Sequence, residues 1–311
     1  MKTAELAYNT LSSKVSKISD MIGNTPLLPL DSLSTDTTKV YAKAEWKQLG
    51  SSVKARAAYA IIQKAIDDGD LHNHKTLLDA SSGNTAIAYG AICKELGLKV
   101  TICLPENASK SRIEELTELG VEIIYTSPFE GTDGAQQKAK ELYALDPVRY
   151  FYADQYNNAN NWKAHYNTTA LEILNQTNNS ITHFIAGLGT TGTFTGTSRR
   201  LKEKIGCTCI ALQPESPMHI MEGWKHLETA VTPGIYDNRV PDEIIHISTD
   251  DTIEMMLEIE RTNDIRISPS SAANLVGAKI VAQRMSSGVV VTMLPDSIER
   301  YKELEAEIFA Q

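Results

Sequence analysis

The chain has 311 residues, of which 42% are hydrophobic, 22% charged and 6% aromatic. This composition excludes a disordered, collagen-like or mucin-like chain and is typical of a globular protein with one large or two modest domains. The net charge is −9, from 30 basic and 39 acidic residues without a basic run, which argues against nucleic acid as a partner. The longest apolar runs have about six residues, whereas a membrane helix needs about 20. Because the N-terminus also lacks an apolar signal segment, we expect a soluble, cytoplasmic protein.

The predicted elements alternate along the chain between short runs rich in valine and isoleucine and longer segments with helical periodicity. This alternation predicts an α/β fold of parallel sheets flanked by helices. The predicted strands are residues 40–45, 76–79, 100–104, 122–125, 181–186, 208–212, 244–247 and 289–294. The predicted helices are residues 54–68, 85–96, 110–119, 133–145, 162–176, 193–204, 252–262, 271–285 and 297–309. An asparagine-rich stretch at 157–161 predicts a crossing between two domains.

The four cysteines are too few for a disulfide framework in a chain of this length. Cys207 and Cys209 form a Cys-Thr-Cys pair, but no second pair or histidine cluster completes a zinc site. We therefore expect these two residues, Cys93 and Cys103 to be buried free thiols, and we expect no bound metal.

Three loops, each placed before a predicted helix, are candidates for binding. The sequence at 187–193, Gly-Leu-Gly-Thr-Thr-Gly-Thr, follows a predicted strand, so backbone N–H groups and the helix dipole favour an anion there. It matches G-x-G-x-x-G, with Glu215 near the end of the next strand, as in a nicotinamide dinucleotide site. The three threonines, however, suit the oxygens of a phosphate monoester better than a pyrophosphate. A tight turn without a ligand is the third possibility.

The second loop, at 79–85, reads Asp-Ala-Ser-Ser-Gly-Asn-Thr. Its hydroxyls, amide and backbone N–H groups could bind a carboxylate, although a helix cap without a ligand is an equal alternative. The third loop, at 50–56, places Lys54 in the first turn of a helix, where a cation opposes the helix dipole. A lysine with a lowered pKa at such a site could form a Schiff base. The alternative for Lys54 is an ordinary solvated surface residue.

Taken together and in this order, the three loops resemble those of the fold-type II pyridoxal-phosphate enzymes, and within them the cysteine synthase and cystathionine β-synthase family. The matching motifs extend over roughly 270 residues, which makes a chance match improbable. They are Ile22-Gly23-Asn24-Thr25-Pro26-Leu27, Ser52-Val53-Lys54, Ser82-Gly83-Asn84-Thr85, Leu104-Pro105-Glu106, Gln155-Tyr156-Asn157-Asn158-Ala159-Asn160, the 187–193 loop and Leu294-Pro295-Asp296-Ser297.

The resemblance implies a role for each matching residue. Lys54 would hold pyridoxal 5′-phosphate as a Schiff base and later take the α-proton. Asn84 would hydrogen-bond the 3′-oxygen of the pyridine ring, and Ser270 would meet the ring nitrogen, although Ser271 fits the motif in a second register. The residues that would bind the cofactor phosphate are Gly189, Thr190, Thr191, Gly192 and Thr193. Those that would bind the substrate α-carboxylate are Ser81, Ser82, Thr85 and Gln155.

Within the family, residues 182–193 and 233–237 look most like the branch that uses O-phosphoserine and a thiocarboxylate-bearing carrier protein. In that branch an arginine binds the substrate phosphate, and Lys225 falls at or beside its position; Lys225 could equally be an ordinary loop residue. The chain departs from the family pattern on both sides of the lysine. Gln48-Leu49-Gly50-Ser51 replaces N-P-G-G, Ala55 replaces an aspartate, and Ser270-Ser271-Ala272 replaces S-S-G.

The resemblance predicts β-elimination or β-replacement on a serine- or cysteine-type amino acid through an aminoacrylate. The favoured reaction is synthesis of cysteine from an activated serine and either sulfide or a sulfur carrier. The alternatives are a cysteine β-lyase that releases sulfide, and a cystathionine or diaminopropionate type of synthase. More distant alternatives are a dehydrogenase and an inactive homologue. The resemblance also implies a homodimer, and a sulfur-carrier protein or an acetyltransferase as a possible partner.

The resemblance implies two domains, with the cofactor between them. Residues 1–45 and 155–311 would form the larger, pyridoxal-phosphate-binding domain. Residues 46–154 would form a smaller mobile domain that carries the carboxylate loop. Since the chain stops at Gln311, soon after the Pro295-Asp296-Ser297 motif, we expect no C-terminal regulatory domain.

Overall fold

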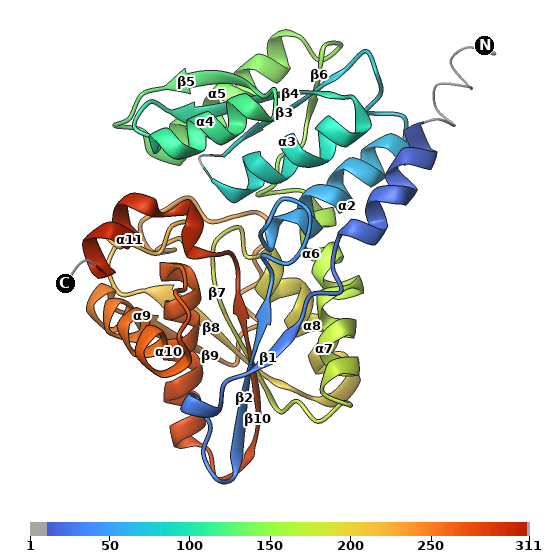
Figure 1. The fold of residues 1–311 in the computed structure, drawn as a ribbon. Helices are drawn as coiled ribbons and strands as arrows, with labels where there is room; N and C mark the ends of the chain where they lie inside the picture. The colour runs from blue at the N-terminus through green and yellow to red at the C-terminus, as the bar shows by residue number, and fades with distance from the viewer. Residues whose placement is uncertain (1–10, 82, 310–311) are drawn as a thin grey trace. The chain divides into compact units, whose positions relative to one another are not determined.

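The computed structural model describes residues 11–81 and 83–309, and contacts divide the chain into two compact units (Figure 1). The first unit holds residues 11–23, 48–50 and 54–161, and the second holds Asn24–Lys47, Ser51–Val53 and residues from Trp162 onward. Each unit contains a sheet of its own flanked by helices, which confirms the predicted α/β class. The assignment of a mobile role to residues 46–154 and of cofactor binding to 1–45 and 155–311 stays a prediction.

The first unit is built on a four-stranded parallel sheet with the strand order β5-β4-β3-β6. Its strands are β3 (Thr76–Ala80), β4 (Lys99–Pro105), β5 (Glu122–Thr126) and β6 (Tyr150–Tyr152). Its helices are α2 (Lys54–Asp67), α3 (Asn84–Leu96), α4 (Lys110–Glu118) and α5 (Gly131–Leu145), with a further helical segment at 11–18. The short 3₁₀ helix η1 (Ser19–Met21) follows that segment.

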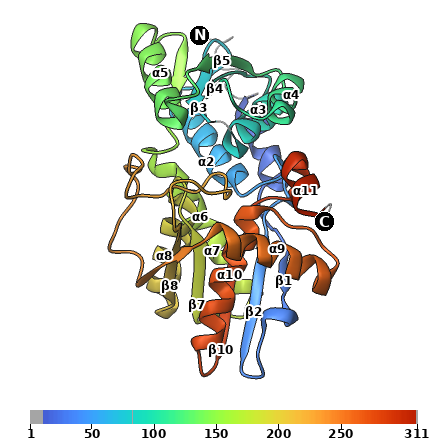
Figure 2. The same ribbon diagram turned by 90° about the vertical axis from the view of Figure 1, so that its left-hand side faces the viewer.

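Both faces of this sheet are covered, which explains why its central strands read as continuous apolar runs. Leu77 packs with α2 and α3, whereas the next residue, Leu78, packs on the opposite face with Ala135 and Ala139 of α5. Figure 2 shows α5 on one side of the strands and α3 and α4 on the other. All residues of β3 are buried, so the end of this strand is held rigidly.

The second unit is built on a six-stranded sheet with the order β1-β2-β10-β7-β8-β9. Its strands are β1 (Leu27–Pro29), β2 (Thr38–Ala44), β7 (His183–Gly187), β8 (Thr208–Pro214), β9 (Glu243–Ile247) and β10 (Gly288–Leu294), and only the β1–β2 pair among them is antiparallel. Its helices are α7 (Thr169–Gln176), α8 (Gly192–Ile205), α9 (Thr249–Asn263), α10 (Pro269–Arg284), α11 (Lys302–Phe309), η2 (Asp31–Leu33) and η3 (Ile298–Arg300). The division between the units falls within α6 (Ala159–Asn167). Figure 1 shows α9 and α10 on one side of this sheet and α7 and α8 on the other.

The predicted elements differ from the structure in several respects. The helical segment at 11–18 and the 3₁₀ helices η1 and η2 were not predicted. Strands β1 and β6 were not predicted, because three residues are too few to show a period of two. The single helix predicted over 162–176 was wrong: α6 and α7 are separated at Thr168, whose backbone is not helical (φ −125°, ψ −72°). The single helix predicted over 297–309 was also wrong, since η3 and α11 replace it.

The expectation of buried free thiols is confirmed for all four cysteines. Among the described residues, no helix is both long enough and apolar enough to cross a membrane. Within the same residues, no group of three or more histidine, cysteine or acidic side chains is arranged to hold a metal ion.

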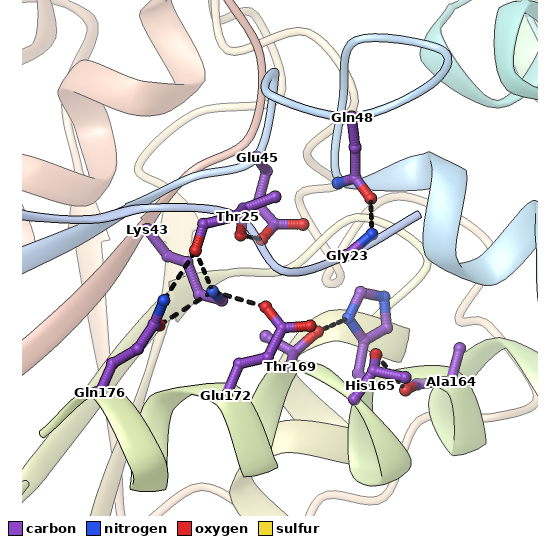
Figure 3. Close-up of polar contacts among 11 residues, drawn as sticks. Gly23, Thr25, Lys43, Glu45, Gln48, Ala164, His165, Thr169, Glu172 and Gln176 are labelled. Carbon is purple, nitrogen blue, oxygen red and sulfur yellow. Dashed lines mark hydrogen bonds and ion pairs between the residues drawn. The ribbon is translucent and has the colours of Figure 1, made fainter. Parts of the chain in front are cut away.

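A buried ammonium group ties strand β2 to helix α7 in the second unit (Figure 3). Lys43 is 0% exposed, and its Nζ lies 2.7 Å from a carboxylate oxygen of Glu172. Nζ also donates to the main-chain oxygen of Thr25 at 2.9 Å and to Gln176 Oε1 at 3.1 Å. The hydroxyl of Thr25 in turn donates to Glu45 at 2.7 Å. These contacts fix the Asn24-Thr25 segment against the sheet.

Replacing Lys43 by methionine tests this arrangement. Lys43→Met leaves the carboxylate of Glu172 mostly buried without its cation, so we expect the free energy of unfolding to fall by about 3 kcal/mol in urea titrations. Lys64→Met is the matched control, because the ion pair of Lys64 with Asp68 is exposed and should contribute little. Equal losses in the two variants would contradict a special role for the buried pair.

Candidate active site

Two of the candidate loops lie at the point in their own sheet where the strand order reverses. In the first unit β3 lies between β4, which follows it in the chain, and β6; in the second unit β7 lies between β8 and β10. The strands that follow in the chain are thus added on one side of β3 or β7, and a later strand is added on the other side. Ligands of open α/β sheets bind at the carboxyl end of strands at such a switch point. The loops after Ala80 and after Gly187 occupy these positions.

The loop after β3 is ordered by its own serine. Ser81 is buried, and its hydroxyl oxygen accepts the N–H groups of Gly83 at 3.2 Å and Ala86 at 3.4 Å. Because Ser81 acts as acceptor in both contacts, its hydroxyl proton can be donated to an anion. Asn84 and Thr85 begin helix α3 directly afterwards. Ser82, which the sequence analysis assigned to the same subsite, lies outside the described residues.

Gln155 is joined to this loop by hydrogen bonds at both ends of its side-chain amide. The hydroxyl of Thr85 donates to Gln155 Oε1 at 2.7 Å, and Gln155 Nε2 donates to the main-chain oxygen of Ala80 at 2.9 Å. The amide of Asn161 donates to the main-chain oxygen of Gln155 at 2.7 Å. Three of the four residues predicted to bind a carboxylate, Ser81, Thr85 and Gln155, therefore lie together in the first unit.

Lys54 is the first residue of helix α2, as predicted, and is partly buried. The residues directly before it belong to the second unit, where the N–H of Val53 donates to the oxygen of Pro295 at 2.8 Å and Ser52 forms a bridge with Asp296. The first turn of α2 contains no acidic side chain. A cation at the start of a helix opposes the helix dipole.

The loop after β7 has the features of a phosphate site. Helix α8 has fourteen residues and begins at Gly192, so the N–H groups of its first turn point out of the helix. Thr191, just before it, has φ +70°, and its buried hydroxyl has no hydrogen-bond partner among the described residues. The hydroxyl of Thr193 lies 3.3 Å from Nε2 of His165. Hydroxyls and N–H groups without a carboxylate suit a phosphate monoester.

Gly189 explains the close packing of this loop. A Cβ atom at Gly189 would lie 2.0 Å from the main-chain oxygen of Gly223, so no other residue fits without moving the backbone. The N–H of Lys225 donates to the oxygen of Leu188 at 2.8 Å. The segment that carries Lys225 is therefore packed against the loop, although the role predicted for its side chain stays a prediction.

Ser270 lies near the start of helix α10 in a cluster of buried polar groups. Ser268 caps the helix and donates to Asp296 Oδ1 at 2.6 Å, while the hydroxyl of Ser270 lies 3.4 Å from the same atom. Ser271 instead donates to the main-chain oxygen of Asp296 at 3.3 Å. Tyr301 donates to Asp296 Oδ2 at 2.7 Å. This cluster fixes both serines, and the choice between them at the ring nitrogen stays a prediction.

Three residues beside these loops were missed by the sequence analysis. Arg112, on α4, lies over the second loop, because a Cβ at Gly83 would come within 2.8 Å of its guanidinium. His165 contacts Thr193, and Asp79 accepts N–H groups from the second loop and from Gln155. Arg112 and His165 stand in predicted helices with no distinctive neighbours. Asp79 was visible as a carboxylate at the end of a buried strand.

The predicted residues thus form one group within each unit. The first unit holds a hydroxyl and amide subsite suited to a carboxylate, together with Lys54 and Asn84 at the starts of two helices. The second unit holds the phosphate-type loop, the segment of Lys225 and the serine cluster around Asp296.

Comparisons with known proteins agree with this chemistry. A family model described as "Pyridoxal-phosphate dependent enzyme" matches residues 18–296. A cysteine synthase of Aquifex aeolicus is 39% identical over 292 residues, which are 90% of this chain and 89% of the relative.

Two solved structures are similar to this chain over nearly its whole length. The cysteine synthase of Entamoeba histolytica has a TM-score of 0.88 at 30% identity and covers 94% of this chain and 90% of its own. A hydrogen sulfide-producing enzyme of Fusobacterium nucleatum has a TM-score of 0.86 at 32% identity, with coverage of 91% and 98%. The resemblance to the cysteine synthase type of pyridoxal-phosphate enzyme and the cofactor predicted from the sequence are confirmed, the O-phosphoserine branch stays a prediction, and the nicotinamide dinucleotide alternative is set aside. The chain belongs to the family of pyridoxal-phosphate dependent enzymes.

Proposed function

We propose that this protein synthesises cysteine from an activated serine and a sulfur donor with pyridoxal 5′-phosphate as cofactor. The observation that carries the proposal is the carboxylate subsite of Ser81, Thr85 and Gln155, in a chain 39% identical to a cysteine synthase. A hydroxyl and amide subsite of this kind fits the α-carboxylate of an amino acid. Most of the binding groups lie on helix starts and strand ends, which hold them in place.

The residues present fit the cofactor. The hydroxyl of Thr191, which has no hydrogen-bond partner in the described part of the chain, and the outward N–H groups of Gly192 and Thr193 would hold its phosphate, with Gly189 and Thr190 completing the loop. Lys54 would attach it covalently, Asn84 would meet the ring oxygen and Ser270 the ring nitrogen. When bound, the cofactor supplies an electron sink that lets the α-proton and then the β-substituent depart. Nζ of Lys54 would accept the α-proton and return it.

For the substrate, the hydroxyls of Ser81 and Ser82 would donate to the α-carboxylate, together with the backbone N–H of Thr85 and the second N–H of Gln155 Nε2. Lys225 would meet a phosphate leaving group if the donor is O-phosphoserine. A lysine offers such a phosphate a point charge rather than the two parallel hydrogen bonds of an arginine.

A second reaction, release of sulfide from cysteine, is a candidate because a hydrogen sulfide-producing enzyme is structurally similar to this chain. The same residues would serve it, since only the β-substituent differs. A cystathionine or diaminopropionate type of synthase would likewise differ only in the nucleophile. We further propose a homodimer in the cytoplasm, with a sulfur-carrier protein or an acetyltransferase as partner, and closure of a mobile 46–154 domain over the substrate.

The visible absorption spectrum of the purified protein tests the proposed reaction. We expect an absorption band from bound cofactor that changes on addition of O-acetylserine or O-phosphoserine and returns when sulfide is added, with cysteine formed. A band that responds to cysteine alone, with sulfide released, would favour the lyase. A protein that takes up no cofactor would instead be an inactive homologue.

Replacing Lys54 by alanine should remove the covalent attachment and the base together. We expect Lys54→Ala to lower the rate by on the order of 10³-fold or more and to abolish the band of the attached cofactor. Lys64→Ala, an exposed position on the same helix, is the matched control and should keep both. Retention of the band in Lys54→Ala would contradict the role assigned to Lys54.

Replacing Gly189 by alanine tests the phosphate loop. The new Cβ would meet the main-chain oxygen of Gly223, so the loop must move, and we expect the affinity for pyridoxal phosphate to fall by about tenfold or more in equilibrium titrations. Gly69→Ala is the control: it introduces a side chain at φ +79° with nothing within 4 Å, and cofactor affinity should not change. Unaltered affinity in Gly189→Ala would argue against phosphate binding at this loop.

A further inference from the structure

Asp79 is a buried carboxylate that the proposed reaction does not use. It stands near the end of β3, directly before the loop that carries Ser81 and Thr85, and its side chain is 0% exposed. Its Oδ1 accepts the N–H of Ala80 at 2.8 Å, and its Oδ2 accepts the N–H of Gln155 at 3.3 Å. One carboxylate thus holds two segments that are 75 residues apart in the sequence.

The surroundings of Asp79 offer no compensating cation. Among the described residues, no lysine, arginine or histidine forms an ion pair with it. Burial, with a smaller contribution from the charge of Asp154, raises the pKa of Asp79 to about 7, although the N–H groups of Ala80 and Gln155 and the hydroxyl of Tyr89 act to lower it. A buried carboxylate without a cation is costly, so this position calls for a reason other than stability.

Apart from Asp154, the other titratable groups that face Asp79 are uncharged at neutral pH. Burial raises the pKa of Cys103, on β4, to about 12 and raises the pKa of Tyr89, on α3, well above its ordinary value. Burial likewise raises the pKa of Tyr152 on β6 and of Tyr156. Asp79 is therefore the group of this cluster whose pKa burial brings close to 7.

The hydrogen bonds of Asp79 close a ring around the carboxylate subsite. Thr85 donates to the side chain of Gln155, and the side chain of Gln155 donates to the oxygen of Ala80. The N–H groups of Ala80 and Gln155 both donate to Asp79. Each member of the ring is buried, so a lost hydrogen bond is not replaced by water.

We propose that Asp79 is a positioning residue for the α-carboxylate subsite: its ionised carboxylate holds Gln155, and through it Ala80 and Thr85, in the arrangement that binds an amino-acid carboxylate. The inference rests on the proposed function. When the carboxylate of Asp79 takes up a proton, the protonated oxygen becomes a hydrogen-bond donor. The backbone N–H that donated to this oxygen then loses a strong acceptor. Substrate binding therefore weakens as the pH falls through about 7.

The folded protein responds to pH in the opposite sense. Since the pKa of Asp79 is higher in the folded chain than the ordinary 3.8, the folded state binds the proton more tightly. The contribution of Asp79 to stability is therefore most favourable below about pH 4 and is lost as the pH rises towards about 7. Removing the charge should not destabilise the protein at pH 8, although it should impair substrate binding.

Asp79→Asn separates these effects. An amide can accept only through its oxygen, so one of the two N–H groups faces a donor. We expect the KM for the amino-acid donor to rise about tenfold, kcat to change less than twofold and the free energy of unfolding at pH 8 not to fall. The dependence of KM on pH near 7 should also disappear in the variant.

Asp154→Asn is the matched control, because it removes an equal charge from the neighbouring residue of Gln155 without touching the ring; Asp154 bonds to the side chain of Asn157. The inference is overturned if Asp79→Asn leaves KM and its pH dependence unchanged, if Asp154→Asn has the same effect, or if wild-type binding improves as the pH falls through 7.

A measurement on the wild-type protein covers the case in which Asp79→Asn does not fold. The amide resonances of Ala80 and Gln155 should titrate together with a midpoint near pH 7, and a saturating amino-acid donor should shift that midpoint. Amide resonances that do not titrate would overturn the inference. A wild-type protein that titrates in this way but takes up no cofactor would contradict the proposed function and leave the role of Asp79 as a structural switch.

Discussion

The N–H groups at the start of a helix that follows a parallel strand have no partners within the helix, and this constraint shapes both candidate loops. A parallel sheet requires a crossover after every strand, and at β3 and β7 the crossovers diverge because the strand order reverses there. The loop at such a point is not covered by the next connection. In this protein the two positions are occupied by Ser81 to Thr85 and by Gly189 to Thr193, which supply hydroxyls beside those N–H groups.

The same chain handles two buried charges in different ways. Lys43 is neutralised by Glu172 and saturated by oxygen acceptors, and the result is a fixed connection between β2 and α7. Asp79 has N–H donors but no cation beside it among the residues that the structure describes, and its pKa rises to about 7. The first arrangement pairs the buried charge with an opposite charge. The second changes its charge at about pH 7, next to groups that we assign to substrate binding.

The departures from the family pattern have local structural explanations. Gln48, which replaces the asparagine of N-P-G-G, accepts the N–H of Gly23 at 2.9 Å and so fixes the Ile22-Gly23 turn. Ala55, in place of an aspartate, is fully buried in helix α2. Neither substitution alters the groups that would hold the cofactor. They change the surroundings of Lys54, and differences of this kind distinguish reactions that share one cofactor chemistry.

The sequence by itself determined the α/β class, most of the strands and helices, the buried free thiols and the family, because hydrophobic periodicity and contiguous motifs are local properties of the chain. It also placed Lys54, Asn84 and the phosphate-type loop at helix starts. The tertiary structure alone decided that Gln155 joins Thr85, that Arg112 lies over Gly83 and that His165 meets Thr193. It also decided the short strands β1 and β6 and the break at Thr168. These features depend on contacts between segments 28 to 70 residues apart, or on elements too short to show a period, and no local pattern encodes either.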